Sequence, residues 1–287
     1  MMRMKGRPLL RFGYLACLLV LSLTLVAPIS AHYPSGEGAR LAAKPEPVEA
    51  PRKSTAPKSP SPGKGFVPPA TDLSHLTGQR GPQVSLALVS SFDWRTTGKV
   101  TSVKNQGLCG SCYAFAALAN IESALLIAGE GSHDYSENNA KECNWYTTSC
   151  SGGNYTKMAS WLSKQGTVLE SCDPYVASNV SCKSTCSYQK TLLDWRIISG
   201  DAVASAGVLQ SYIQAYGPVY TSLYAGDGDA WETEFQNYDG SYTLYYAGVE
   251  EPNHAVLIVG WDDSLAHAGG TGAWIVKNSW GTSWGGT

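Results

Sequence analysis

The chain has 287 residues, of which 43% are hydrophobic and 15% charged, and its formal net charge is −2. A chain of this size and composition can bury a core and hold one or two domains. So small a net charge provides no basic surface of the kind that binds nucleic acid or an anionic membrane. We therefore expect no nucleic acid among its partners, and no membrane beyond the N-terminal segment.

The N-terminus is typical of a secretory signal. Four basic residues between Arg3 and Arg11 precede a mostly apolar run at 12–26, and small residues follow up to Ala31. A basic start, a short apolar centre and a small-residue end indicate a cleaved signal, which we assign to residues 1–31. The run is shorter than the about 20 residues of a membrane span. We expect a secreted protein, with an uncleaved anchor as the alternative.

Residues 32–90 are expected to form a linker or pro-segment that is largely disordered. Pro, Ala, Ser and Lys are frequent in residues 32–70 and large apolar residues are few, so this stretch cannot build a core. Residues 72–90 could lie over a site, but no feature of them requires it. Order is expected to begin near the Ser-Phe-Asp-Trp-Arg stretch at 91–95.

The first half of the ordered part, residues 91–200, is expected to be mainly helical. Apolar residues after Cys112 recur on more than one face, which indicates a buried helix, and Gly129 follows as a stop. A Ser cap and an apolar spacing of i, i+3, i+4 and i+7 indicate two further helices. The predicted helices lie at 112–128, 136–143 and 155–166.

The second half, residues 201–287, is expected to be mainly β. One helix, at 209–216, is stopped by Gly217 and Pro218. The runs that follow are rich in β-branched and aromatic residues, which is typical of strands. The predicted strands lie at 219–224, 242–246, 254–261 and 273–277.

The stretch Gln-Gly-Leu-Cys-Gly-Ser-Cys-Tyr-Ala-Phe at 106–115 holds two cysteines three positions apart. A Cys-Gly-Ser-Cys-Trp/Tyr motif with His and Asn far downstream is the local signature of the papain/cathepsin nucleophile. Both partners are present, in Asn-His-Ala-Val at 253–256 and Lys-Asn-Ser-Trp-Gly at 277–281. On these motifs the chain closely resembles the papain-like cysteine peptidases.

The spacing of the motifs agrees with this resemblance. His254 lies 142 positions after Cys112, inside the family's window of about 130–150. Asn278 lies later, 166 positions after Cys112, and the Gly-rich turn at 268–272 could be an inserted loop that accounts for this.

The resemblance implies an α+β, papain-like fold over residues 91–287. A helical domain and an antiparallel, β-barrel-like domain would meet at a cleft that holds the active site. In the family, the Asn-Ser-Trp-Gly-x-x-Trp-Gly motif is followed by a further strand of the β half. We therefore expect this sequence to be truncated at its C-terminus, with the last strands missing; a second domain that lacks a closing strand is the alternative.

The resemblance also assigns roles to residues. Cys112, at the start of a predicted helix whose N-terminus lowers a thiol pKa, would attack the peptide carbonyl. His254 would protonate the leaving amine and later activate water, and Asn278 would hold its ring. Gln106 would join the Cys112 backbone N–H in the oxyanion hole. This chemistry calls for no metal and no cofactor. The expected substrate-binding residues are Gly152, Gly153, Asn253 and Trp280, the last also shielding the His–Asn bond.

Seven cysteines follow the signal segment. In an exported protein an odd number suggests three bridges and one free thiol, and Cys112 is the candidate for the free one. The resemblance implies a bridge between Cys109 and Cys150. Six cysteines permit 15 pairings, and for the remaining four we expect Cys143 with Cys182 and Cys172 with Cys186.

Other interpretations exist for each residue. A lone Cys is usually a small buried apolar side chain, and His254 on an apolar strand would by default belong to the core. Cys109 and Cys112 could be a redox pair, but the βαβ context of such pairs is absent, and zinc binding would need closer paired spacings. The three motifs together favour a monomeric, secreted cysteine endopeptidase that acts on polypeptides through a thioester intermediate. A catalytically silent papain-fold binding or adhesion module is the alternative, and no stretch suggests the cleft-filling element of an exopeptidase.

Overall fold

The computed structural model describes residues 62–73, 75, 87–199 and 203–286, all of which fall within one compact unit, Thr55–Thr287. The expected signal segment and the first part of the predicted linker lie outside the described residues. Within the described ranges, no helix is long and apolar enough to cross a membrane.

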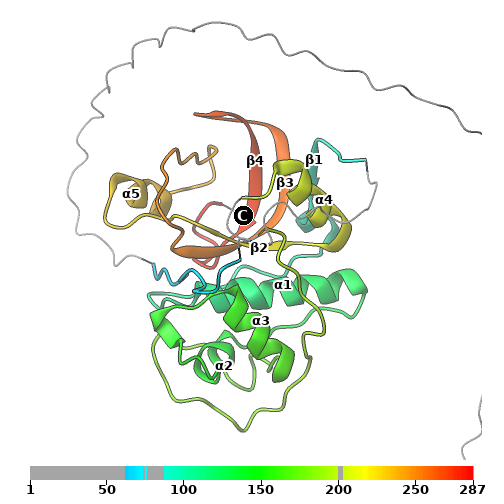
Figure 1. The fold of residues 1–287 in the computed structure, drawn as a ribbon, viewed down its shortest axis with the longest axis vertical. Coiled ribbons are helices and arrows are strands. Elements are labelled where there is room, and N and C mark those ends of the chain that lie inside the picture. The colour runs from blue at the N-terminus through cyan, green and yellow to red at the C-terminus, as the bar shows by residue number, and fades with distance from the viewer. Residues whose placement is uncertain (1–61, 74, 76–86, 200–202, 287) are drawn as a thin grey trace, which may run out of the picture. The chain divides into compact units, whose positions relative to one another are not determined.

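The helical part is built around one buried helix, α1, as Figure 1 shows. Tyr113 and Leu118 of α1 pack with Met158 and Leu162 of α3 in one core cluster. The helix ends at Gly129, whose φ of 79° lies in the left-handed region that glycine enters without strain. The three helices predicted for this half are confirmed to within a few residues: α1 is Cys112–Ala128, α2 is Glu137–Glu142 and α3 is Tyr155–Lys164.

The sheet is organised around its longest strand, β3. β2 and β1 pair antiparallel with successive stretches of one edge of β3, at 254–258 and 260–262, and β4 pairs with the other edge. Leu257 and Val259 of β3 pack against Ala119 of α1, so the sheet lies directly on the buried helix. The strands and the preceding helix are β1 Ser91–Asp93, α4 Ala206–Tyr216, β2 Val219–Leu223, β3 His254–His267 and β4 Gly270–Lys277.

Two expectations about the β half are corrected. The four strands form an open sheet, so the barrel-like closure is not found among the described residues. The predicted strand at 242–246 is wrong, because these residues pair with none of the four strands of the sheet. The Tyr246 ring instead packs on Tyr224 and Trp231.

Two further features of the second half add to the sequence-based expectations. The turn at 268–272 lies at the tip of a hairpin, since β3 and β4 pair out to His267 and Gly270. A short helix, α5 (Ala230–Gln236), was not predicted. It begins at Asp229, whose side chain accepts a hydrogen bond from the Glu232 N–H at 2.8 Å, the usual arrangement of an N-cap.

Candidate active site

Cys112 is the first residue of α1, and it is fully buried. It is the only free cysteine of the described residues. The backbone N–H of Ala255, near the start of β3, donates a hydrogen bond to the Cys112 Sγ at 3.3 Å. Burial raises the pKa of the Cys112 thiol to about 12, although the N–H groups of Ala255 and Gly65 act in the opposite direction. In this state the thiol is protonated.

His254, the first residue of β3, is fully buried, and it directly precedes Ala255, whose N–H contacts that thiol. Its Nε2 shares a hydrogen bond of 2.8 Å with Oδ1 of Asn278, and the Trp280 ring covers the imidazole at 4.7 Å between ring centroids. The other ring nitrogen, Nδ1, has no hydrogen-bond partner among the described residues. Burial lowers the pKa of His254 to about 4, against the raising effect of the Asn278 bond, and the Lys64 charge lowers it further.

Gln106 joins the loop before α1 to the loop after β4. Its Nε2 donates to the Gly63 carbonyl at 2.8 Å and to the Cys109 carbonyl at 2.9 Å. Its Oε1 accepts a hydrogen bond from the Ser279 hydroxyl at 2.5 Å. The amide is therefore fixed with one N–H aimed at a carbonyl oxygen of another segment.

That segment, residues 63–67, makes hydrogen bonds to Gln106 and to three of the expected substrate-binding residues, Trp280, Gly153 and Asn253. Gly63 O also accepts a hydrogen bond from Trp280 Nε1, at 3.3 Å. Gly153 N–H donates to Gly65 O at 2.9 Å, and Gly153 O accepts from the Val67 N–H at 2.9 Å. The Phe66 N–H donates to the Asn253 carbonyl at 3.0 Å.

The segment also makes close side-chain and backbone contacts. The Phe66 side chain is buried in a cluster with Cys112, Ala116 and Ala255, and its ring is stacked on that of Tyr155 at 6.4 Å between centroids. The other expected substrate-binding residue, Gly152, passes so close that a Cβ on it would lie 2.8 Å from Gly65 O. Residues 63–67 thus fill the groove in which a substrate backbone was expected.

This placement differs from the expected linker at 32–90. The backbone contacts that hold residues 63–67 need no particular side chains, so a composition rich in Pro and Ser did not reveal them. One signal was present: Phe66 is the only Phe, Tyr or Trp between Tyr33 and Phe92. It follows a Gly-Lys-Gly triplet, and a Cβ on the second glycine, Gly65, would lie 1.8 Å from the Gly110 carbonyl oxygen.

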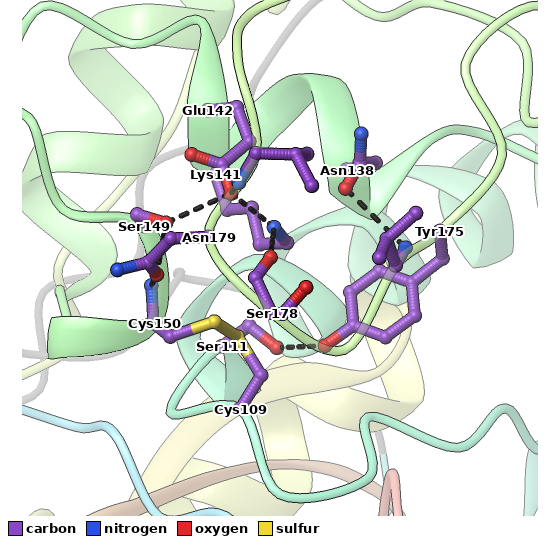
Figure 2. A network of polar contacts seen from close by, with 12 residues as sticks. Cys109, Ser111, Asn138, Lys141, Glu142, Ser149, Cys150, Tyr175, Ser178 and Asn179 are labelled. Atoms are coloured by element: carbon purple, nitrogen blue, oxygen red, sulfur yellow. Dashed lines mark hydrogen bonds and ion pairs between the residues drawn. A yellow bond between two sulfur atoms is a disulfide. The ribbon is translucent and has the colours of Figure 1, made fainter.

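The loop that carries Cys112 is braced from the helical side, as Figure 2 shows. The Ser111 and Tyr175 hydroxyls share a hydrogen bond of 2.6 Å, and the Tyr175 hydroxyl donates to the Gln106 carbonyl at 2.9 Å. Asn179 Oδ1 accepts from the Cys150 N–H at 3.1 Å. The disulfides are Cys109–Cys150, Cys143–Cys182 and Cys172–Cys186, the same three pairs that were expected.

Comparisons with known proteins agree on one family. Residues 88–287 match the family model described as papain family cysteine protease. Human cathepsin O is 33% identical over 206 residues, which cover 71% of this chain and 60% of that protein. The chain therefore spans less than two thirds of the length of this curated relative.

Two solved structures share the fold. The digestive procathepsin L 3 of the Tenebrio molitor larval midgut has a TM-score of 0.59 at 30% identity, covering 77% of this chain and 67% of that one. The bromelain protease from Ananas comosus, solved in complex with the E64 inhibitor, has a TM-score of 0.58 at 28% identity, covering 69% of this chain and 86% of that one.

Proposed function

The chain belongs to the papain family of cysteine proteases, and from this premise we propose that it is a secreted cysteine endopeptidase with Cys112, His254 and Asn278 as its catalytic residues. One observation carries the proposal. The free thiol of Cys112 accepts a hydrogen bond from the backbone N–H of Ala255, the residue after His254, and the His254 ring is hydrogen-bonded to Asn278. The three disulfides are typical of proteins in oxidising compartments and support secretion.

The chemistry follows from these positions. With His254 as its imidazolium partner, the Cys112 thiolate attacks the peptide carbonyl carbon, and the carbonyl oxygen becomes an oxyanion. His254 gives its proton to the leaving nitrogen, the C–N bond breaks, and a thioester remains on Cys112. His254 then takes a proton from water, whose oxygen attacks the thioester carbon. The C–S bond breaks, the carboxylic acid is released, and the Cys112 thiolate and the His254 imidazolium are restored.

Gln106 is placed to stabilise the oxyanion. Its Nε2 already donates to a carbonyl oxygen, that of Gly63, in the groove. With residues 63–67 displaced from the groove, we expect Gln106→Ala to lower kcat by about 10²–10³, the loss typical of one oxyanion-hole donor, with a smaller change in KM. Steady-state kinetics on a peptide substrate measure this. An unchanged kcat in a folded Gln106→Ala variant would remove Gln106 from the mechanism.

The direction of residues 63–67 explains why the groove can hold them without cleaving them. Since His254 gives its proton to the leaving nitrogen, a substrate's leaving part is expected on the side of His254 and Trp280, whose rings lie 4.7 Å apart between centroids. The acyl part, which precedes the scissile bond, is then expected on the opposite side, beside Gly153. The segment runs the opposite way, from Gly63 at Trp280 to Val67 at Gly153. We infer that this segment holds the peptidase in a closed, inactive form. Because it crosses the position of Cys112 with residues on both sides, the groove suits cleavage within a chain rather than at its end.

Acid is expected to favour release of the segment. In the closed form the pKa of His254 is about 4, against an ordinary value of 6.5. Between these pH values a solvent-exposed His254 binds a proton that the buried one does not, so the closed form loses stability relative to the released form as the pH falls. Since one pKa unit corresponds to a tenfold change in the equilibrium, we expect the released fraction to rise about tenfold or more between pH 6.5 and 4.5.

Hydrogen exchange measures this directly. The Phe66 and Val67 amides, corrected for their intrinsic exchange rates, should lose protection on acidification, whereas the Leu257 amide in β3 serves as the control. Equal protection of Phe66 and Val67 at both pH values would contradict the expectation.

The proposed reaction has a distinctive intermediate that tests it. With the segment displaced, a peptide substrate quenched in acid should leave its acyl part on the peptide that carries Cys112, visible as a mass increase. A catalytically silent binding module would bind the peptide and show no such adduct. Absence of the adduct together with unchanged substrate peptide would overturn the proposed function.

A further inference from the structure

Lys64 reaches from the segment into a separate small subsite. Its Nζ forms an ion pair with Glu232 Oε1 at 2.6 Å and donates to the Gly226 carbonyl at 2.6 Å. The pair is largely enclosed, since the Lys64 side chain is 19% exposed and that of Glu232 is 12% exposed. An ammonium group is thus bound between one carboxylate and one backbone carbonyl.

The carboxylate is held in place by its own helix and the turn before that helix, and not only by Lys64. The Gly228 N–H donates to Glu232 Oε2, and Gln236 Nε2 donates to Oε1 at 2.8 Å. Gly226 has a φ of 93°, and a Cβ on it would lie 2.2 Å from the Glu232 Cβ, so a glycine is needed for the approach. When Lys64 leaves, Glu232 therefore keeps its position.

A vacated Glu232 would be a half-enclosed carboxylate without a cation. The hydrogen bond from Lys64 lowers the pKa of Glu232 in the closed form, and the Gly228 N–H does so as well. The Gly228 N–H remains when Lys64 leaves, so it continues to favour the charged form of the carboxylate. Residues 225–251, which surround it in sequence, contain seven acidic residues and no Lys or Arg, so their field attracts cations to this end of the groove.

The subsite lies on the leaving-group side of the reacting thiol. Along the segment, Gly65 contacts Cys112 and Gly153, whereas Gly63 and Lys64 precede them on the side of Trp280. The Lys64 charge is also close enough to His254 to lower its pKa. Since His254 protonates the leaving amine in the proposed mechanism, the side chain bound here belongs to the residue just after the scissile bond.

We propose that Glu232 and the Gly226 carbonyl form a subsite that selects Lys or Arg directly after the scissile bond. This inference rests on the proposed function, because it assigns a substrate class to the same site. Polypeptides with basic residues are then the preferred substrates. In the closed form the Lys64 side chain occupies the subsite that the Lys or Arg side chain of a substrate would occupy.

Matched peptides test the subsite in the full chain with Gly65→Val, a substitution expected to displace the segment. Internally quenched peptides differ only in the residue after the scissile bond, which is Lys, norleucine or Glu, and mass spectrometry verifies the cleaved bond. Norleucine keeps the side-chain length of Lys and lacks its charge. We expect kcat/KM to be about ten- to a hundredfold higher for Lys than for norleucine, the usual effect of a hydrogen bond to a charged group.

Three substitutions in α5 separate the local contact from the general field. Glu232→Gln should bring the Lys-to-norleucine ratio close to one, and Glu232→Lys should make Glu the better residue. Glu234→Gln removes an equal charge from an exposed position of the same helix and should leave the ratio unchanged.

The outcomes distinguish this inference from the function on which it rests. Cleavage of all three peptides with equal kcat/KM would overturn the subsite and leave the peptidase intact. The same holds for a Lys preference that survives Glu232→Gln. If no peptide is cleaved and Cys112 forms no acyl adduct, both the function and the subsite are overturned.

Discussion

A Gly65→Val substitution in the full chain is expected to raise the hydrolysis of an added peptide by about ten- to a hundredfold. In the closed form a Cβ on Gly65 would lie 1.8 Å from the Gly110 carbonyl oxygen. That neighbour is backbone, next to the disulfide-bonded Cys109, so it cannot turn aside as a side chain could. Forcing extra atoms into a packed site costs about 1–3 kcal/mol, and each 1.4 kcal/mol shifts the closed–released equilibrium tenfold.

Initial rates on a quenched peptide measure this effect, with Ala70→Val as the control. Ala70 is exposed and lies beyond the groove, so the same added side chain should leave the rate unchanged there. If Gly65→Val and the unmodified chain hydrolyse the peptide equally fast, residues 63–67 do not hold the enzyme closed.

In the Gly65→Val background, Cys112→Ala and His254→Ala should each lower kcat by about 10⁴–10⁶. Cys112→Ala removes the nucleophile and His254→Ala removes the proton carrier. When catalytic groups act as a unit, removing one of them lowers kcat nearly as much as removing all of them. For the same reason, the double variant should be little worse than either single one. Steady-state kinetics on one peptide provide the comparison, with kcat calculated from the concentration of folded protein.

His267→Ala is the matched control for His254→Ala, because His267 lies at the far end of the same strand and stacks on Tyr245 at the surface. It should retain full activity. Hydrolysis that persists within tenfold in a folded Cys112→Ala variant would show that another group is the nucleophile.

The residues near the thiol could be predicted because the motifs are contiguous in sequence. Cys112 starts α1, and the Gln106 to Cys112 stretch is one loop, so the positions of its side chains follow from local structure. His254 and Asn278 were found from short motifs that β3 and β4 place at the start of α1. The helices were predicted well for the same reason, since a periodic apolar face is a local feature.

The rest depended on contacts that leave little trace in a sequence. Residues 63–67 are held by backbone N–H and C=O groups, which nearly every residue has, and by glycines that permit close approach. The tyrosines at 242–246 suggested a strand, but their rings pack on other aromatic rings instead, as Tyr246 does on Trp231. Glu232 could have been noticed through the Asp-x-x-Glu spacing from Asp229, which is typical of a helix N-terminus, but its partner Lys64 lies 168 positions away.

The most direct test of the central claim is labelling with an epoxide that forms a thioether with activated cysteine thiolates, monitored by mass spectrometry of the intact chain. We expect stoichiometric labelling of Gly65→Val at Cys112, no labelling of Gly65→Val combined with Cys112→Ala, and slow labelling of the unmodified chain at neutral pH. Acidification should speed labelling of the unmodified chain relative to Gly65→Val. A folded Gly65→Val protein that remains unlabelled across the range from acid to neutral pH would contradict a peptidase that uses Cys112 and is closed by its own upstream segment.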